Sequence, residues 1–217
     1  MILVPVKNLS HAKQRLASLL DQSSRTELAQ AMLFDVLEAL ASWTHRPAVS
    51  IVTSDPFAVG LAQRFSFDVI PDNANRSETD AIEMATQICE ARGIDSTLVI
   101  PGDIPLIQPQ ELEQILKTAP AEGSVLAPAA DGRGTNAAFR RPAGLFPLRF
   151  GNDSFKPHLA AARATGKACV ILSLSGIALD VDSPSDLRQL AQAAGESRSQ
   201  RLARQWDLTD PSRAANE

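Results

Sequence analysis

The chain contains no tyrosine, and aromatic side chains make up only 5% of its 217 residues. Proteins that hold single-stranded nucleic acid usually stack bases on aromatic rings, and little material for such a platform is present. Basic residues are also in the minority, with 21 Lys and Arg against 25 Asp and Glu, a formal net charge of −4. Because a nucleic-acid partner calls for a broad basic surface, we expect no nucleic-acid partner.

Cysteine and long apolar runs are scarce as well. The two cysteines, Cys89 and Cys169, are far apart and have no metal or redox spacing, so they are expected to be small hydrophobic residues in a reducing compartment. No apolar run approaches the ~20 residues that cross a bilayer. The apolar start "MILVPVKNL" lacks the basic region and cleavage site of a signal peptide. The sequence therefore predicts a cytoplasmic protein without a membrane contact.

The hydrophobic content, 44%, is sufficient for one well-buried domain. Strand-like and helix-like stretches alternate along the first 130 residues. The predicted strands are 2–6, 48–54, 67–72, 96–103 and 124–130, and the predicted helices are 23–43, 77–93 and 108–118. This alternation favours βαβ units, and it predicts an α/β protein with a single-domain, Rossmann-like, three-layer α/β/α fold and a mostly parallel central sheet.

The regular alternation ends at residue 131. A glycine turn in 131–135 is expected to lead into another strand, and 150–154 is expected to be a loop before a helix. Residues 167–194 predict one or two more strands and a final helix. We place the domain at residues 1–196 and expect 197–217 to be a polar C-terminal tail with a frayed helix.

A lone acid follows the fourth predicted strand in "TLVIPGDIPL", residues 97–106. Open α/β sheets bind ligands outside the carboxyl ends of their strands, and Asp103 is expected at that edge. The same residues suit an ordinary turn, so Asp103 alone does not decide between a turn and a metal ligand.

In "ALDVDSPSDL", Asp180 and Asp182 are expected at the end of a further strand and on one side of it. Carboxylates that converge from two segments suit Mg²⁺ beside substrate phosphates.

Basic side chains follow the first predicted strand. Lys7, Lys13 and Arg15 occur there, in a stretch where Asp21 is the single acid up to residue 25. A solvated helix face has a similar composition. The spacing also suits a loop that wraps a triphosphate.

Two further segments are candidate anion sites. In "DGRGTNA", Gly132 and Gly134 can turn backbone N–H groups toward one point, and Thr135 adds a hydroxyl; a hairpin turn is the alternative. In "FGNDSFKPH", Gly151 precedes a predicted helix that Ser154 or Asp153 caps, and the helix start can bind an anion. His158 lies in that helix, where we interpret it as a packing residue.

These motifs occur together in the order "PVKNLSHAKQRLASLL", "PGDIPLI", "GRGTNA", "FGNDSFKPH" and "LDVDSPSDL". Together they resemble the family of 2-phospho-L-lactate and phosphoenolpyruvate guanylyltransferases of deazaflavin coenzyme biosynthesis, over residues 1–190. The resemblance implies a nucleotidyltransferase fold related to the molybdenum-cofactor guanylyltransferases. It also implies transfer of GMP from GTP to phosphoenolpyruvate, 2-phospho-L-lactate or 3-phosphoglycerate, with release of pyrophosphate.

The resemblance also implies roles for individual residues. Mg²⁺ is expected on Asp103 and Asp182, and the phospho-carboxylate on Thr135, Gly151 and Ser154. Lys7, Lys13 and Arg15 are expected to bind the nucleotide and, with Asp103, to be catalytic. Many relatives carry a GLN-type turn near the guanine where this chain has "NANRSETDAI", and Asp80 is expected in place of the Asn.

Three alternatives stay open from the sequence. The chain can be a molybdopterin guanylyl- or cytidylyltransferase, although those relatives usually carry a glycine-rich LAGG-type turn that is absent from "VPVKNLSHAKQRL". It can also be a catalytically silent nucleotide-binding protein, because a fold can persist after its function is lost. The sequence also leaves open whether the protein forms a homodimer.

Overall fold

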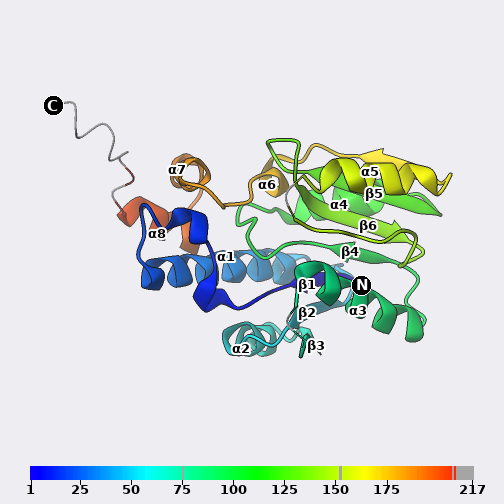
Figure 1. The fold of residues 1–217 in the computed structure, drawn as a ribbon, viewed down its shortest axis with the longest axis horizontal. Helices are drawn as coiled ribbons and strands as arrows, with labels where there is room; N and C mark the ends of the chain where they lie inside the picture. The colour runs from blue at the N-terminus through cyan, green and yellow to red at the C-terminus, as the bar shows by residue number, and fades with distance from the viewer. Residues whose placement is uncertain (75, 152, 207, 209–217) are drawn as a thin grey trace.

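The computed structural model describes residues 1–74, 76–151, 153–206 and 208, and its centre is a seven-stranded sheet (Figure 1). The strands are β1 Ile2–Pro5, β2 Val49–Thr53, β3 Asp68–Pro71, β4 Thr97–Val99, β5 Gly123–Pro128, β6 Thr135–Arg141 and β7 Ala168–Ile171. Their order across the sheet is β3-β2-β1-β4-β6-β5-β7. Every neighbouring pair is parallel except those that involve β6, which runs antiparallel to β4 and β5.

Helices cover both faces of this sheet. They are α1 Gln22–Ser42, α2 Pro56–Arg64, α3 Glu78–Ala91, α4 Pro109–Thr118, α5 Phe155–Ala164, α6 Ser175–Ala178, α7 Pro184–Gln192 and α8 Arg198–Gln205, with 3₁₀ helices η1 Leu9–His11 and η2 Gln14–Leu16. Successive strand side chains point to opposite faces. Accordingly Ile2 and Val4 pack with the helices α1, α2 and α4, whereas Leu3 packs with α3. Because both faces are covered, the strands are almost continuously apolar.

This architecture confirms the predicted three-layer α/β/α fold with a mostly parallel sheet. Two local predictions were incomplete. The helix α2 between β2 and β3 was not predicted from the sequence. The segment of Asp180 and Asp182 is not the end of a strand, because α6 precedes it and residues 179–182 are extended without joining the sheet.

Besides the apolar clusters on the two faces of the sheet, a third apolar cluster joins the two ends of the chain. Leu16 and Leu20 follow β1, and they pack with Leu187 of α7 and Ala203 of α8 against α1. Figure 1 shows α7 and α8 beside one end of α1. The predicted boundary at residue 196 thus falls between two packed helices, and the segment expected as a polar tail begins with α8. Its last part, 207 and 209–217, lies outside the described residues.

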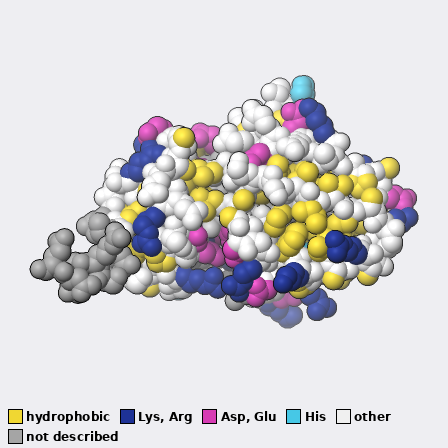
Figure 2. All heavy atoms as spheres, turned by 90° about the horizontal axis from the view of Figure 1, so that it is seen from above, with side chains coloured by type: hydrophobic (Ala, Val, Ile, Leu, Met, Phe, Trp, Pro, Cys, Tyr) yellow, Lys and Arg dark blue, Asp and Glu magenta, His cyan; other side chains and the backbone are white. Residues whose placement is uncertain are grey.

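The surface offers one partly apolar region at the edge of the sheet. Figure 2 shows hydrophobic side chains gathered on the half of the face where Figure 1 draws α5 and β7. The edge strand β7 contributes to this exposure, since its Ile171 is 43% exposed. Among the described helices, none is long and apolar enough to cross a membrane.

Candidate active site

Two adjacent parallel strands, β1 and β4, direct their following loops to the same edge of the sheet. The β1 loop carries Lys7, Lys13 and Arg15, and the β4 loop carries Asp103. The segment after α6 reaches the same edge, because the Val181 N–H donates to the Asp103 carbonyl oxygen at 3.2 Å. This single backbone bond places Asp182 beside Asp103.

Lys13 lies between the two carboxylates. Its Nζ is 2.5 Å from Asp103 Oδ2 and 2.7 Å from Asp182 Oδ1, and its side chain is only 7% exposed. Lys13 also has a left-handed backbone, with φ of 56°, which is uncommon for a residue with a side chain. The structure therefore brings together three residues that the sequence separates by up to 169 positions.

The charges in this cluster stabilise one another. Burial alone would lower the pKa of Lys13, but the carboxylates of Asp103 and Asp182 outweigh it and raise the pKa above its usual value. Burial would likewise raise the pKa of Asp182, and the Lys13 ammonium holds it below its ordinary value instead. Lys13 and Asp182 are thus charged at neutral pH.

Asp180 has a different environment from Asp182. Burial raises the pKa of the Asp180 carboxyl, and the nearby Asp103 adds to that effect, although Asn136 Nδ2 donates to Asp180 Oδ1 at 3.0 Å. The intervening Val181 is fully buried. Asp180 and Asp182 therefore do lie on one side of the segment, as predicted from the two-residue period, even though it is not a strand.

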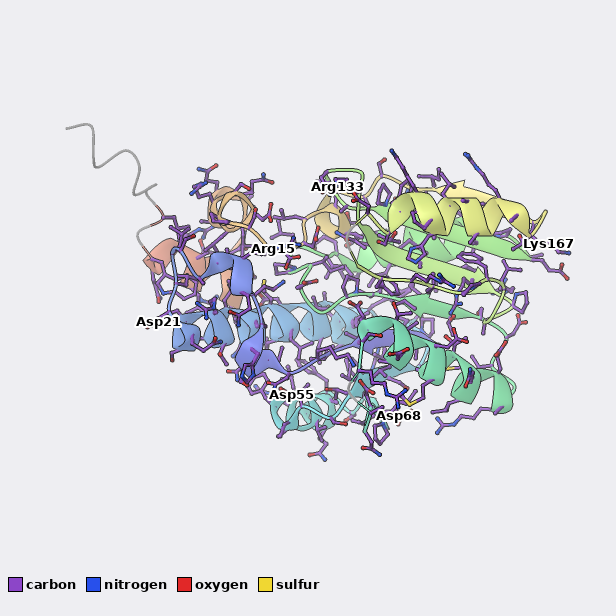
Figure 3. The ribbon with its side chains drawn as sticks, in the orientation of Figure 1. Arg15, Asp21, Asp55, Asp68, Arg133 and Lys167 are labelled. Carbon is purple, nitrogen blue, oxygen red and sulfur yellow. The ribbon has the colours of Figure 1, made fainter. Side chains whose placement is uncertain are left out.

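A polar cavity of about 480 Å³ opens above this cluster. We call it the polar cavity. Its walls include all the residues predicted for the phospho-carboxylate, and it also has two guanidinium groups, those of Arg15 and Arg133. Figure 3 shows Arg15 near η2 and Arg133 on the β5–β6 loop. The walls carry six carboxylates, from Glu78, Asp103, Asp131, Asp153, Asp180 and Asp182.

A second cavity of about 290 Å³, the mixed cavity, lies on the β1 side. Lys7 and Lys13 line it together with apolar side chains of the β1 loop and α1, among them Leu9 and Met32. The Lys7 ammonium forms an ion pair with the buried Asp72 at the end of β3. Arg15 was predicted beside Lys7 and Lys13, but it lines the polar cavity instead. The two cavities share four lining residues, Glu78, Pro101, Asp103 and Asp182.

Thr135, Ser154 and His158 form one hydrogen-bonded group at the floor of the polar cavity. Ser154 Oγ lies 3.3 Å from Thr135 Oγ1, and His158 Nδ1 lies 2.9 Å from the same oxygen. All three side chains are buried. Gly151 lines the cavity with a φ of 138°, a backbone conformation that other residues rarely adopt. The structure therefore brings together the three residues predicted for the acceptor.

The two predicted anion sites are partly filled by the chain itself. In the β5–β6 loop, the Arg133 N–H donates to Asp131 Oδ1 at 2.8 Å, and the Gly134 N–H approaches the same oxygen at 3.4 Å. The Gly134 N–H thus points toward an anion, the carboxylate of Asp131, but the Gly132 N–H donates to the Ala129 carbonyl oxygen at 2.9 Å. At the start of α5, the Phe155 N–H donates to the Arg133 carbonyl oxygen at 2.8 Å. The Phe155 N–H at this helix start therefore already has an acceptor within the chain.

Asp80, expected near the guanine, is exposed and is not among the described residues that line either cavity. It lies in the first turn of α3, where its N–H donates to Ser77 Oγ, the cap of the helix, and its Oδ2 accepts from the same hydroxyl. Glu78 lines both cavities. Successive residues of a helix are rotated by about 100°, so Glu78 and Asp80, which are two positions apart, point to nearly opposite sides of α3. In the sequence, Glu78 is only an acid in the first turn of a helix. A negative charge there is also explained by its favourable interaction with the helix dipole.

The electrostatics of Glu78 differ from those of a surface acid. Burial, and then the negative charge of Asp103, raise the pKa of Glu78 to about 7. Among the described residues, no three His, Cys, Asp or Glu side chains are close enough to form a metal site by themselves. Asp103 and Asp182 already hold one cation, the Lys13 ammonium, so they fit a hard cation that takes its other ligands from phosphates and water.

The model of the family described as "Guanylyl transferase CofC like" matches residues 1–214. A phosphoenolpyruvate guanylyltransferase of Roseiflexus castenholzii is 35% identical over 204 residues, which cover 94% of this chain and 93% of that protein. A 2-phospho-L-lactate guanylyltransferase of Methanothermobacter thermautotrophicus is 34% identical over 188 residues, with 87% and 82% covered.

Solved structures agree on the fold. A Desulfovibrio desulfuricans G20 protein, provisionally described as a nucleotide-diphospho-sugar transferase, superposes with a TM-score of 0.76 at 19% identity and covers 94% of this chain and 93% of its own. A CMP:2-keto-3-deoxy-manno-octonic acid synthetase complexed with CTP gives a TM-score of 0.59 at 15% identity, with 88% and 95% covered. The predicted nucleotidyltransferase fold is thereby confirmed.

Proposed function

The chain belongs to the family of CofC-like guanylyl transferases, and from this premise we propose that it transfers GMP from GTP to a small phospho-carboxylate and releases pyrophosphate. Curated relatives carry the names phosphoenolpyruvate guanylyltransferase and 2-phospho-L-lactate guanylyltransferase. The proposed acceptor is therefore phosphoenolpyruvate, 2-phospho-L-lactate or 3-phosphoglycerate. The product would serve the biosynthesis of a deazaflavin coenzyme.

The observation that supports this reaction best is the shared wall of the two cavities. A group transfer needs two substrates whose reacting atoms meet at one point. The polar and mixed cavities have Asp103, Asp182 and Glu78 in common. Two substrates bound one in each cavity would therefore meet beside these carboxylates and beside Lys13.

We assign the nucleotide to the mixed cavity and the acceptor to the polar cavity. Apolar walls beside Lys7 and Lys13 suit a nucleoside with its phosphates. The Thr135 hydroxyl, which accepts a hydrogen bond from Ser154, and the backbone at Gly151 suit a small anion instead. Arg15 and Arg133, at the polar cavity, supply the positive charge for a carboxylate or a phosphate.

In the proposed reaction, a phosphate oxygen of the acceptor attacks the α-phosphorus of GTP. A new P–O bond forms there, and the bond between the α-phosphorus and the α–β bridging oxygen breaks, so that pyrophosphate leaves with that oxygen. The attacking oxygen is already anionic, and no general base is needed. The residues of the chain orient the two substrates, while Lys7 and Lys13 stabilise the charge on the leaving group.

Mg²⁺ is the proposed cofactor, and Asp103 and Asp182 would hold it. Six carboxyl side chains and two guanidinium groups line the polar cavity, and Lys13 balances only part of these acids, so a further cation would favour the binding of a polyanionic acceptor. When bound, the ion would neutralise charge on the phosphates and so favour their approach. Lys13 now occupies the space between the two carboxylates, and it would have to move toward the phosphates.

The test is a pyrophosphate-release matrix that crosses GTP, ATP, CTP and UTP with the three acids, with and without Mg²⁺. We expect GTP to exceed CTP and UTP with at least one acid, and turnover to need the metal. Equal or better turnover with CTP would overturn the guanylyl assignment. Full turnover in EDTA would overturn the metal proposal alone.

A further inference from the structure

His158 is a buried titratable group for which the proposed reaction has no direct use. It lies in α5, 1% exposed, and its ring meets Phe150 edge to face at a centroid distance of 5.2 Å. It does not line the polar cavity. Nevertheless it bonds Thr135, which does.

The hydrogen bonds of His158 assign its tautomer. The backbone N–H of Arg149 donates to Nε2 at 2.7 Å, so Nε2 carries no proton. A neutral imidazole has one N–H, which is then at Nδ1. This N–H donates to Thr135 Oγ1 over 2.9 Å. A protonated imidazolium would direct a second N–H at the Arg149 N–H and is excluded by this arrangement.

The charged surroundings of His158 also keep it neutral. Burial, followed by the positive charge of Arg140, lowers the pKa of His158 to about 4, which outweighs the opposite effect of the Arg149 bond. The Nδ1–H donor is consequently present throughout the neutral pH range. Arg140 is itself buried in β6, where its guanidinium bonds the Phe146 carbonyl oxygen at 2.6 Å.

The direction of the Thr135 hydroxyl follows from these contacts. A hydroxyl has one proton to donate and two lone pairs that accept. Thr135 Oγ1 accepts from His158 Nδ1, and it also accepts from Ser154 Oγ at 3.3 Å. With both lone pairs occupied, the Thr135 proton has to point elsewhere, and the open side of this residue is the polar cavity.

We propose that His158 is a positioning residue, which holds Thr135 so that its hydroxyl proton is presented to the anionic acceptor. The inference rests on the proposed function, because it takes the polar cavity as the acceptor site. His158 touches neither substrate and transfers no proton. It fixes the donor direction before the acceptor arrives, which reduces the ordering that binding requires.

A packing role for His158 predicts different kinetics. A residue that only fills space would lower the stability when replaced, and it would disturb the two substrates to a similar extent. A positioning residue acts through Thr135, so its effect should be confined to the acceptor and should vanish once the Thr135 hydroxyl is absent. Steady-state kinetics of single and double variants separates the two roles.

The experiment uses the full chain and four variants: His158→Phe, Thr135→Val, the double variant, and Thr135→Ser. Phosphoenolpyruvate and GTP are varied separately. Thr135→Val should raise the acceptor KM by roughly ten- to a hundred-fold, the effect of a lost hydrogen bond to a charged group. His158→Phe should raise it by about ten-fold, and the double variant should match Thr135→Val. The GTP KM should change by less than about two-fold in each, and Thr135→Ser, which keeps the hydroxyl, should raise the acceptor KM less than Thr135→Val does.

Several results would overturn the proposal. An unchanged acceptor KM in His158→Phe would do so, as would a further increase when His158→Phe is added to Thr135→Val. A loss in Thr135→Ser as large as that in Thr135→Val would show that the hydroxyl is not the group involved. His45→Phe, at an exposed histidine after α1, is the matched control. Melting curves check folding, and His158→Leu replaces His158→Phe in the cycle if the phenylalanine is not accommodated.

The same data separate this inference from the proposed function. Wild-type enzyme that transfers GMP to none of the three acids would overturn both. Wild-type enzyme that transfers GMP normally, with His158→Phe indistinguishable from it, would overturn the role of His158 and leave the guanylyl transfer in place.

Discussion

At the scale of the residue, Asp103 lies in the turn after β4, and the Lys13 cluster bears on whether it is also a functional acid. A turn aspartate bonds its own backbone and points to solvent. Asp103 instead contacts a buried ammonium together with an acid from a distant segment. Isolated buried charges are costly, so the three groups depend on one another. A substitution at Asp103 should therefore affect both catalysis and stability.

The first prediction concerns Asp103→Asn, which keeps the shape and removes the charge. We expect kcat to fall by about two orders of magnitude or more, because a proposed metal ligand is lost. The ligand-free protein should also melt a few degrees lower, by about 2–4 °C for each kcal/mol lost, because Lys13 keeps only Asp182. The assays are pyrophosphate release and thermal melting.

Asp68→Asn is the matched control, since Asp68 lies on the edge strand β3 and is exposed (Figure 3). Near-normal turnover in a folded Asp103→Asn protein would show that Asp103 is only a turn residue. An increased melting temperature would show that Asp103 and Asp182 repel each other more than Lys13 attracts them.

The second prediction uses the depressed pKa of His158. Between an unfolded pKa near 6.5 and a folded value of about 4, the unfolded chain binds a proton that the folded one does not. The free energy of unfolding of wild type is therefore highest, as far as His158 is concerned, above pH 6.5. It falls by about 3 kcal/mol in all as the pH falls toward 4. His158→Phe lacks this term, so its free energy of unfolding should fall less over that range.

The readout is the wild-type-minus-variant difference in urea denaturation from pH 7.5 to 4.5. Taking a difference removes the opposite contribution of Glu78, whose pKa burial raises to about 7. His45→Phe, at the exposed histidine after α1, is the control variant for the same comparison. A constant difference for His158→Phe across the range would mean that His158 titrates normally.

At the scale of the element, the buried Asp35 of α1 fixes α8. Its Oδ1 accepts from the Arg198 N–H at 3.0 Å, and its Oδ2 accepts from the Ser199 N–H and hydroxyl at 2.9 and 2.5 Å. A negative charge at a helix N-terminus is favourable. The sequence could not indicate this contact, because Asp35 is one acid within a long apolar helix and its partners are 163 and 164 residues away.

The third prediction follows for Asp35→Asn. The amide removes the charge and directs an NH₂ at N–H donors, so unfolding should require about 1.5–3 kcal/mol less. Urea denaturation followed by tryptophan fluorescence measures this, since Trp206 directly follows α8 and packs on the third cluster. Glu38→Gln, on the exposed side of α1, is the control. A free energy of unfolding equal to that of wild type would indicate that the docking of α8 contributes as little to stability as a polar tail would.

The helices and strands that the sequence predicted best are those with strong local signals. Helix α3 lies within the predicted range 77–93, where Ser77 Oγ accepts from the Asp80 N–H, and the apolar runs of β1 and β4 became buried strands. The stretch around Asp180 misled, because "IALDV" has strand-like composition, yet α6 takes its first residues and Asn136 bonds the carbonyl oxygens of Ile177 and Ala178. Such tertiary bonds are invisible to local periodicity.

At the scale of the whole molecule, the rule for open α/β sheets located the site from the sequence. It predicted that Asp103 and the basic β1 loop would meet at one edge, and they do. It could not say which side of that edge each residue faces. Arg15 and Lys13 are two positions apart, yet Arg15 faces the polar cavity while Lys13 lines the mixed one. The direction depends on the left-handed turn at Lys13 and on η2, which no pattern indicated.

The last prediction concerns the division of the molecule into two substrate sites. Lys7 lines only the mixed cavity, and Ser154 lines only the polar one. Lys7→Met should raise the KM for GTP by about ten-fold or more, because a contact to an anion is lost. Ser154→Ala should raise the acceptor KM by a similar factor, because Thr135 Oγ1 loses the hydrogen bond from Ser154 that helps to direct its proton into the polar cavity. In both variants the other KM should stay within about two-fold, since each interaction reaches one substrate.

Asp103→Asn lies on the shared wall and should lower kcat without this selectivity. A combined Lys7→Met and Ser154→Ala variant should show the sum of the two free-energy losses, because residues in separate cavities without shared partners act independently. Melting temperatures with and without GTP check that Lys7→Met has not unfolded the β3 end through Asp72. If Ser154→Ala changes the GTP KM and Lys7→Met the acceptor KM, the substrates occupy the opposite cavities, and the direction of transfer across the Asp103–Asp182 wall is reversed.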